Sequence, residues 1–335
     1  MAKRVAILGA GSWALAVSKV LLDNGNVVSL WEFDAGECER LRETRLLPNK
    51  LPGFELDASV MVTNNIAEAV EACDLIVLAV PSQSLRSALT YLKPHLSQPV
   101  PLVNLAKGVE NDSYKRMSQV VVEELGCRES MVATISGPSH AEEVAVNVPT
   151  TVVAAGNDAV VVQSLQDLFS NQFFRVYSSD DLVGVELGGS LKNIIAIGVG
   201  IADGLGMGDN TRGALITRGL AEITRLGLAM GARAETFAGL SGIGDLVTTC
   251  TSRHSRNRFV GEKIGQGQTL KNILEEMHQV AEGVATTRSG FELAEQVGVE
   301  MPITGQVYRV LFENKLPLEA VSELMGRTLK AELWR

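Results

Sequence analysis

The segment KRVAILGAGSWA, residues 3–14, decides the fold of this chain. A short apolar run ends at Gly9, and the pattern Gly9-x-Gly11-x-x-Ala14 leads into an apolar helical pattern. Gly9 allows a tight turn, Gly11 lets a ligand approach the backbone, and Ala14 allows close packing of helix on strand. The free N–H groups at the start of that helix suit a pyrophosphate. The segment therefore predicts a strand, turn and helix that bind a dinucleotide.

Strand-like and helix-like segments alternate over residues 1–180, which predicts a parallel, doubly wound α/β sheet. From about residue 182 to Trp334 we find only helical periodicity punctuated by glycine. We therefore expect a dinucleotide-binding Rossmann domain over residues 1–181 and an all-helical domain over residues 182–335. The expected strands are 3–9, 26–31, 60–63, 74–80, 100–105, 131–136, 150–155 and 173–177, and the expected helices of the first domain include 13–23, 82–92, 113–125 and 158–170.

Length and composition indicate an ordinary soluble protein. The chain has 335 residues, enough for two domains with their own cores, and 46% of them are hydrophobic. A net charge of −9 argues against nucleic acid as a partner, so an anion site must be a local cluster. The four cysteines lack CxxC spacing, which predicts neither a metal site nor a disulfide framework and suits a reducing cytoplasm. We expect no signal peptide and no membrane insertion.

A lysine and an asparagine interrupt the most apolar helical segment. The segment GSLKNIIA, residues 189–196, contains Lys192 and Asn193. Burial lowers the pKa of an ammonium, which then exchanges a proton near neutrality; the alternative is a lysine that extends from a core helix to water. Gly198, Gly200 and Asp203 are expected to break this helix soon after. The small neighbours of the lysine predict space beside its amine for another group, these being Gly188, Gly189 and Ala196.

Polar residues follow the predicted strands where they end, which is where α/β sheets bind ligands. Lys107 follows the fifth strand and would point into the cleft, the alternative being a solvated loop lysine. Ser139 follows the sixth strand and is a candidate N-cap for a helix.

A third polar cluster lies in the helical half. Asp245 and Thr249 are one helical turn apart and would share a face. Arg256 and Asn257 combine a planar fork donor with a helix N-terminus, which suits a phosphate. For Arg253 and Arg258 we favour a basic surface turn.

Taken together, these segments resemble the NAD(P)-dependent glycerol-3-phosphate dehydrogenase family, in its bacterial form. The likeness covers almost the whole chain, and its motifs occur in the order of the family. The motifs are Gly9-x-Gly11-x-Trp13-Ala14, Ala106-Lys107-Gly108, Ser136-Gly137-Pro138-Ser139, Gly189-x-x-Lys192-Asn193, Asp203-Gly204, Gly208-x-Asn210, Gly244-Asp245-Leu246, Ser255-Arg256-Asn257 and Val280-x-Glu282-Gly283.

This resemblance implies reversible reduction of dihydroxyacetone phosphate to sn-glycerol 3-phosphate, a phospholipid precursor, by a cytoplasmic enzyme that is commonly a homodimer. The cofactor would be NAD or NADP, and Lys192 would be the general acid–base residue. The implied substrate site comprises Lys107, Gly137, Ser139, Lys192, Asn193, Asp245, Thr249, Ser255, Arg256 and Asn257. The implied coenzyme site comprises Gly9, Gly11, Ser12, Trp13, Glu32, Phe33, Lys107, Ala141, Arg256, Val280 and Glu282.

The segment after the second strand, residues 30–34, departs from many bacterial relatives. It reads LWEFD and lacks the basic residue that meets the 2′-phosphate of NADPH. Glu32 would accept a hydrogen bond from the ribose 2′-hydroxyl of NAD and repel a 2′-phosphate. We therefore expect a preference for NADH, or at least weaker discrimination in favour of NADPH. The alternative is that a nearby arginine supplies the missing charge, the candidates being Arg40, Arg42 and Arg45.

Other functions stay open at this stage. A β-hydroxy-acid dehydrogenase also combines a Rossmann domain with a helix-borne lysine and asparagine, but the Ser255–Asn257 and Gly244–Leu246 segments argue against it. A non-catalytic nucleotide sensor would not need Lys192, and a Rossmann methyltransferase would not need the helical half. His140 and His254 are set aside as bases, because neither has an orienting carboxylate in its sequence context.

Overall fold

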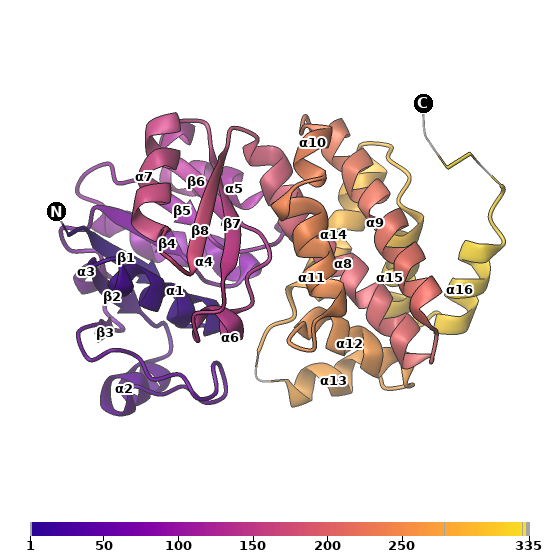
Figure 1. Ribbon diagram of the computed structural model, residues 1–335, viewed down its shortest axis with the longest axis horizontal. Coiled ribbons are helices and arrows are strands. Elements are labelled where there is room, and N and C mark those ends of the chain that lie inside the picture. The colour runs from indigo at the N-terminus through magenta and orange to yellow at the C-terminus, as the bar shows by residue number, and fades with distance from the viewer. Residues whose placement is uncertain (1, 278, 330, 333–335) are drawn as a thin grey trace.

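The computed structural model describes residues 2–277, 279–329 and 331–332, and it has a sheet-containing half and a helical half (Figure 1). Every strand coincides with a predicted one, with ends that differ by a few residues at most. The strands are β1 (Arg4–Leu8), β2 (Val27–Trp31), β3 (Met61–Thr63), β4 (Leu75–Leu78), β5 (Leu102–Asn104), β6 (Val132–Ser136), β7 (Thr150–Gly156) and β8 (Phe174–Ser179).

These strands form one eight-stranded sheet in the order β3-β2-β1-β4-β5-β6-β7-β8. The neighbouring strands from β3 to β6 in this order pair in parallel, as predicted. In contrast, β7 is antiparallel to β6, and β8 is parallel to β7. The prediction of a parallel sheet is therefore wrong at this edge. The connection between β6 and β7 contains one short α-helix, α6 (Ala141–Val144), in place of the longer crossover helix that usually joins parallel strands.

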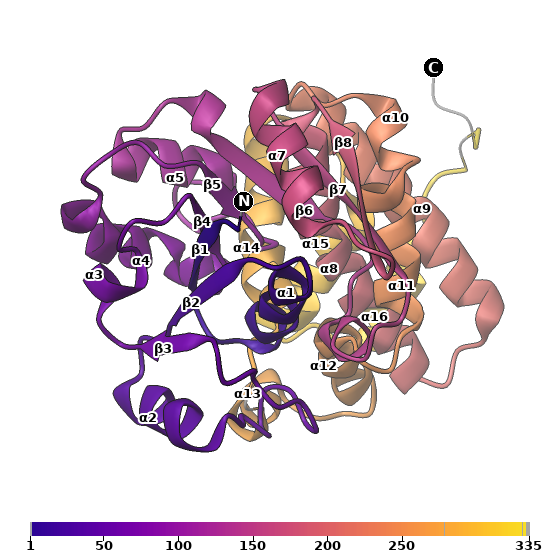
Figure 2. The same cartoon turned by 60° about the vertical axis from the view of Figure 1, so that its left-hand side comes forward.

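Both faces of the sheet are covered by helices (Figure 2). Val5 and Ile7 of β1 pack in one apolar cluster, whereas Ala6 and Leu8 pack in the other. Strands buried on both faces read as continuous apolar runs, which is why they were predictable. One cluster includes α1 (Ser12–Asp23), α2 (Ala35–Thr44), α6 and α7 (Ala159–Phe169), and the other includes α3 (Ile66–Ala69), α4 (Leu85–Leu92) and α5 (Met117–Leu125).

After β8, the described residues contain helices and irregular segments but no strand, as predicted; Trp334 lies outside the described residues. A π-helical turn at Leu240–Gly244 directly precedes α11. The helices are α8 (Leu182–Gly204), α9 (Asp209–Ala229), α10 (Ala234–Phe237), α11 (Asp245–Thr251), α12 (Arg256–Gly265), α13 (Leu270–Glu276), α14 (Glu282–Gln296), α15 (Pro302–Phe312) and α16 (Pro317–Met325).

The central element of the helical half is α8, which the other long helices surround (Figure 1). It is long and apolar enough to cross a membrane, but 94% of its apolar window is buried inside the fold. The prediction that glycines break this helix is wrong, because it continues to Gly204. Gly200 instead allows α12 to approach, since a Cβ there would lie 2.1 Å from the carbonyl oxygen of Arg258.

Candidate active site

A cavity of about 770 Å³ lies where the carboxyl ends of the strands meet the helical half. Its walls come from the segments that follow β1, β2, β4, β5 and β6. Further wall residues come from α8, from α11 and from the starts of α12 and α14. The central strands β1 and β4 are neighbours here, although α1 and α4 pack on opposite faces of the sheet. Such a switch point is the usual ligand site of a doubly wound sheet.

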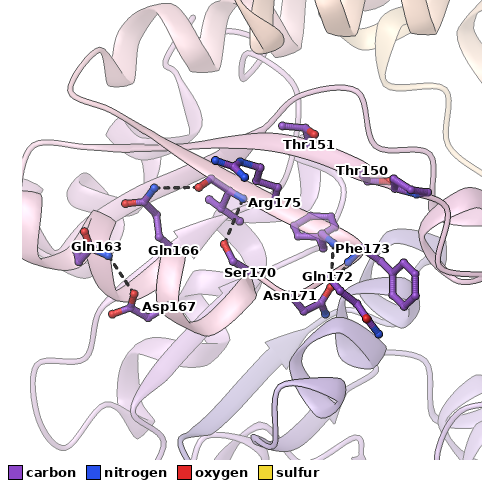
Figure 3. A pocket seen from close by; sticks show the side chains of 13 residues that line it. Thr150, Thr151, Gln163, Gln166, Asp167, Ser170, Asn171, Gln172, Phe173 and Arg175 are labelled. Carbon is purple, nitrogen blue, oxygen red and sulfur yellow. Dashed lines mark hydrogen bonds between the residues drawn. The ribbon is translucent and has the colours of Figure 1, made fainter.

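A second cavity, of about 860 Å³, lies beside α7, β7 and β8 (Figure 3). Much of its polar lining is already paired locally. Gln166 donates to the carbonyl of Val176 over 2.9 Å, and Gln163 donates to Asp167 over 3.0 Å. This cavity includes neither the glycine turn nor Lys192, so the first cavity is the candidate active site.

The glycine turn has the geometry that a dinucleotide needs. Gly9 has a φ of 108°, and a Cβ there would lie 2.8 Å from the carbonyl oxygen of Ala79. A Cβ on Gly11 would meet nothing within 4 Å, so the backbone is open to the cavity. The first turn of α1 holds no acidic residue, and no side chain of the described residues caps it. Its N–H groups therefore fit a pyrophosphate.

Lys192 lies at the inner wall of the cavity and is 5% exposed. Its Nζ donates to Asp245 Oδ1 and, over 2.6 Å, to Thr249 Oγ1. The other oxygen of Asp245 accepts from Lys107 Nζ over 2.8 Å, and Lys107 also donates to the carbonyl of Gly137 over 2.9 Å. One buried carboxylate thus holds two ammonium groups at the cavity.

Burial is the main influence on the protonation of this cluster. It lowers the pKa of Lys192 to about 7, a shift that Lys107 reinforces and Asp245 opposes. For Asp245, burial raises the pKa, but the two ammonium groups outweigh it and the net shift is downward. Asp245 therefore stays ionised, and Lys192 can donate or accept a proton near neutral pH. Because its Nζ is buried, the alternative of a lysine that reaches bulk water is wrong.

The two glycines beside Lys192 allow other segments of the protein to pack closely against α8. A Cβ on Gly188 would lie 2.5 Å from the carbonyl oxygen of Ser241, and one on Gly189 would lie 2.3 Å from Ser136 Oγ. Atoms of the protein itself therefore fill the predicted space beside these two glycines. Glycine there lets the π-helical turn and the end of β6 pack against α8.

Two asparagines connect the elements around the cavity. Asn257 donates to Asn193 Oδ1 over 2.9 Å, and its own Oδ1 accepts from the N–H of Gly283 over 2.9 Å. Beside this link, Glu282 accepts from the N–H of Ser82 over 2.9 Å and also from its hydroxyl. These contacts join α8, α12 and α14 to the segment after β4.

Arg256 opens α12 at the cavity wall. Ser255 is the N-cap of this helix, and its Oγ accepts from the N–H of Arg258 over 3.2 Å. Arg256 Nη1 donates to the carbonyl of Val280 over 3.0 Å, and its side chain is exposed. The remaining guanidinium donors and the helix N-terminus can receive an anion.

The structure brings the predicted site residues together. All of them line the cavity except Gly137 and Asp245, and both of these accept a hydrogen bond from Lys107. The prediction that Ser139 caps a helix is wrong, because α6 begins at Ala141 and has His140 at its N-cap position. Ser139 Oγ instead donates to the carbonyl of Gly137 over 3.0 Å.

Sequence reasoning missed several residues of the cavity wall. His140 and His254, which it set aside, both line the cavity, with ring centroids 6.0 Å apart. Burial lowers the pKa of His140, with a further contribution from Lys192, so this imidazole is neutral at neutral pH. Lys50 and Gln279 also line the wall from irregular segments, which carry no periodic signal.

Comparison with known proteins agrees with this geometry. Residues 4–162 and 181–322 match the models of the N-terminal and C-terminal parts of NAD-dependent glycerol-3-phosphate dehydrogenase. The NAD(P)+ glycerol-3-phosphate dehydrogenase of Geobacter sulfurreducens is 51% identical over 335 residues, which is 100% of both chains. The glycerol-3-phosphate dehydrogenase structure from Coxiella burnetii has a TM-score of 0.93 and 39% identity, and the match covers 97% of this chain and 99% of that one. The chain therefore belongs to the NAD-dependent glycerol-3-phosphate dehydrogenase family.

Proposed function

We propose that this protein reversibly reduces dihydroxyacetone phosphate to sn-glycerol 3-phosphate with NADH or NADPH. The observation that carries the proposal is the buried Lys192–Asp245–Lys107 cluster, which faces the same cavity as the glycine turn. Residues 1–181 would hold the coenzyme, and residues 182–335 would supply the acid–base and phosphate-binding groups. The test is oxidation of NADH and of NADPH by dihydroxyacetone phosphate, followed by absorbance.

In this reaction the nicotinamide, when bound, supplies the hydride to the ketone carbon. Lys192 then gives a proton from Nζ to the oxygen of that carbon, which would otherwise carry a negative charge. Asp245 orients the ammonium, because it accepts from both Lys192 and Lys107. Lys107 adds a second positive charge beside the reacting oxygen. In the opposite direction, neutral Lys192 removes the proton of the alcohol.

Substrate phosphate would lie at the start of α12, away from the carbon that reacts. The exposed Arg256 side chain and the first-turn N–H groups of α12 support this placement. Binding through a distant phosphate orients the ketone without blocking Lys192.

A pH profile tests the role of Lys192. Only protonated Lys192 can donate, so kcat for ketone reduction should be level below pH about 7 and fall above it. The reverse oxidation needs neutral Lys192, so its kcat should rise through the same range. In Asp245→Asn the carboxylate that raises the pKa of Lys192 is lost, and both limbs should move to lower pH. Profiles that stay flat from pH 6 to 8 in both directions would assign the proton transfer elsewhere.

Coenzyme preference follows from the charges after β2. Glu32 lines the cavity, whereas Arg42 pairs with Glu39 and Arg45 donates to the carbonyl of Val60. We expect a higher kcat/KM with NADH than with NADPH at saturating dihydroxyacetone phosphate. Phe33→Arg adds a cation at the cavity wall and should reduce the ratio of kcat/KM with NADH to kcat/KM with NADPH. A strong NADPH preference in the unmodified protein would contradict this expectation.

We further propose that the protein acts in the cytoplasm as a homodimer and feeds glycerophospholipid synthesis. All four cysteines are free thiols in this structure, in keeping with a reducing compartment. Light scattering coupled to gel filtration measures the oligomeric state directly, and a monomer mass at micromolar concentration would contradict the dimer.

A further inference from the structure

Lys50 is the cation beside Glu32, and it comes from the irregular segment between α2 and β3. Its Nζ lies 3.1 Å from Glu32 Oε2 and 2.5 Å from Glu37 Oε2. Glu32 in turn accepts from the N–H of Asp34 over 3.0 Å. The side chains of Lys50 and Glu32 are only 23% and 11% exposed. These three side chains form a partly buried group, the Lys50 cluster (Glu32, Glu37 and Lys50).

The helical half fixes the position of this segment. Gln279 Nε2 donates to the carbonyl of Asn49 over 3.0 Å and to that of Lys50 over 2.9 Å. Gln279 and Lys50 both line the cavity. The backbone of Lys50 is therefore held across the cleft, and its ammonium is kept at the place where Glu32 would meet the adenosine ribose.

The Lys50 cluster has one positive and two negative charges. Burial alone would lower the pKa of Lys50, but the two carboxylates more than compensate and raise it above its usual value. The ammonium is therefore charged and already engaged by two carboxylates. A further anion at this place would meet a net negative charge, whereas a neutral hydroxyl can donate to Glu32.

We propose that Lys50 is a masked anchor for the ribose 2′-phosphate, and that Glu32 and Glu37 set the coenzyme preference by occupying its ammonium. The proposal rests on the dinucleotide site of the proposed function. Its consequence is specific: removal of the two carboxylates releases a cation that the protein already holds at the right place, without the introduction of any new basic residue.

The test compares two nucleotides that differ only in the 2′-phosphate, adenosine 2′,5′-bisphosphate and adenosine 5′-monophosphate. Calorimetry gives the dissociation constant of each. The unmodified protein should bind the monophosphate more tightly. In the double variant Glu32→Gln/Glu37→Gln, the affinity for the bisphosphate should rise about tenfold or more relative to the affinity for the monophosphate. This is the scale of one charge-assisted contact.

Two triple variants identify the cation. Adding Lys50→Gln to the double variant should abolish the gain, whereas adding Arg42→Gln should keep it, because Arg42 is on α2 and pairs with Glu39. A cooperative thermal unfolding transition near that of the unmodified protein shows that each variant is folded. Because Glu32→Gln also removes a carboxylate that the ribose 2′-hydroxyl would meet, the variants are compared by the ratio of the two dissociation constants.

Three results would overturn the proposal: no gain in the double variant, a gain that survives Lys50→Gln, or no binding of either nucleotide by any variant. Nucleotide binding is measured without dihydroxyacetone phosphate. Failure of the proposed reaction can therefore be distinguished from failure of the Lys50 proposal. If the protein binds both nucleotides as expected but does not oxidise NADH with dihydroxyacetone phosphate, the Lys50 proposal stands and the proposed substrate is wrong.

Discussion

Replacing Lys192 by alanine is expected to lower kcat for the reduction of dihydroxyacetone phosphate at least ~100-fold, the scale of a lost general acid. The reason is that the pKa of Lys192 is lowered to about 7 and that Asp245 and Thr249 orient its Nζ at the cavity wall. Affinity for NADH should change little, because the glycine turn that would hold the pyrophosphate lies between β1 and α1, whereas Lys192 is on α8. Stopped-flow absorbance gives kcat, and quenching of tryptophan fluorescence gives the coenzyme affinity.

Two controls separate proton transfer from a structural effect. Methylamine added to Lys192→Ala should restore part of the rate, because it can occupy the space of the missing amine and supply its proton. Thr249→Val keeps the ammonium and its carboxylate while removing one acceptor, so its loss should be much smaller. Near-normal turnover in a folded Lys192→Ala variant would reject Lys192 as the acid.

The sheet was predictable because its strands are buried on both faces. Ala6 and Val77 belong to apolar runs that need no side-chain alternation, and glycine or polar residues mark the strand ends. Strand direction has no such signal, and the reversal at β7 was missed for this reason. Gly200 was misread as a helix breaker, because its contact with Arg258 is a tertiary one that composition does not show.

The site was predictable where a motif fixes both residue type and place. Lys107, Lys192 and Asp245 are each on separate segments, and resemblance to a family assigned them together before the structure showed their contacts. Lys50 and Gln279 carry no comparable mark. They meet across more than two hundred residues of chain, through backbone carbonyls that any residue supplies. Only the folded structure reveals that contact.

Replacing Arg256 by alanine is expected to affect phosphorylated and unphosphorylated substrates very differently. A charge-assisted contact to phosphate contributes roughly 1.5–3 kcal/mol, so kcat/KM for dihydroxyacetone phosphate should fall about 10- to 100-fold. Dihydroxyacetone has no phosphate, and its low kcat/KM should stay nearly constant. The two values are measured with the same NADH assay at saturating coenzyme.

Arg253→Ala is the matched control, because Arg253 is an exposed arginine three residues earlier that does not line the cavity. It tests whether general loss of positive charge near the cleft slows capture of an anion, an effect that salt would screen. If Arg256 binds phosphate, only its own replacement should discriminate between the two substrates, and added salt should not remove the difference. Arg256 also donates to the carbonyl of Val280, just before α14, and the family resemblance implies that both residues contact the coenzyme. Equal losses with both substrates would therefore assign Arg256 to the coenzyme and leave the helix N-terminus of α12 as the phosphate site.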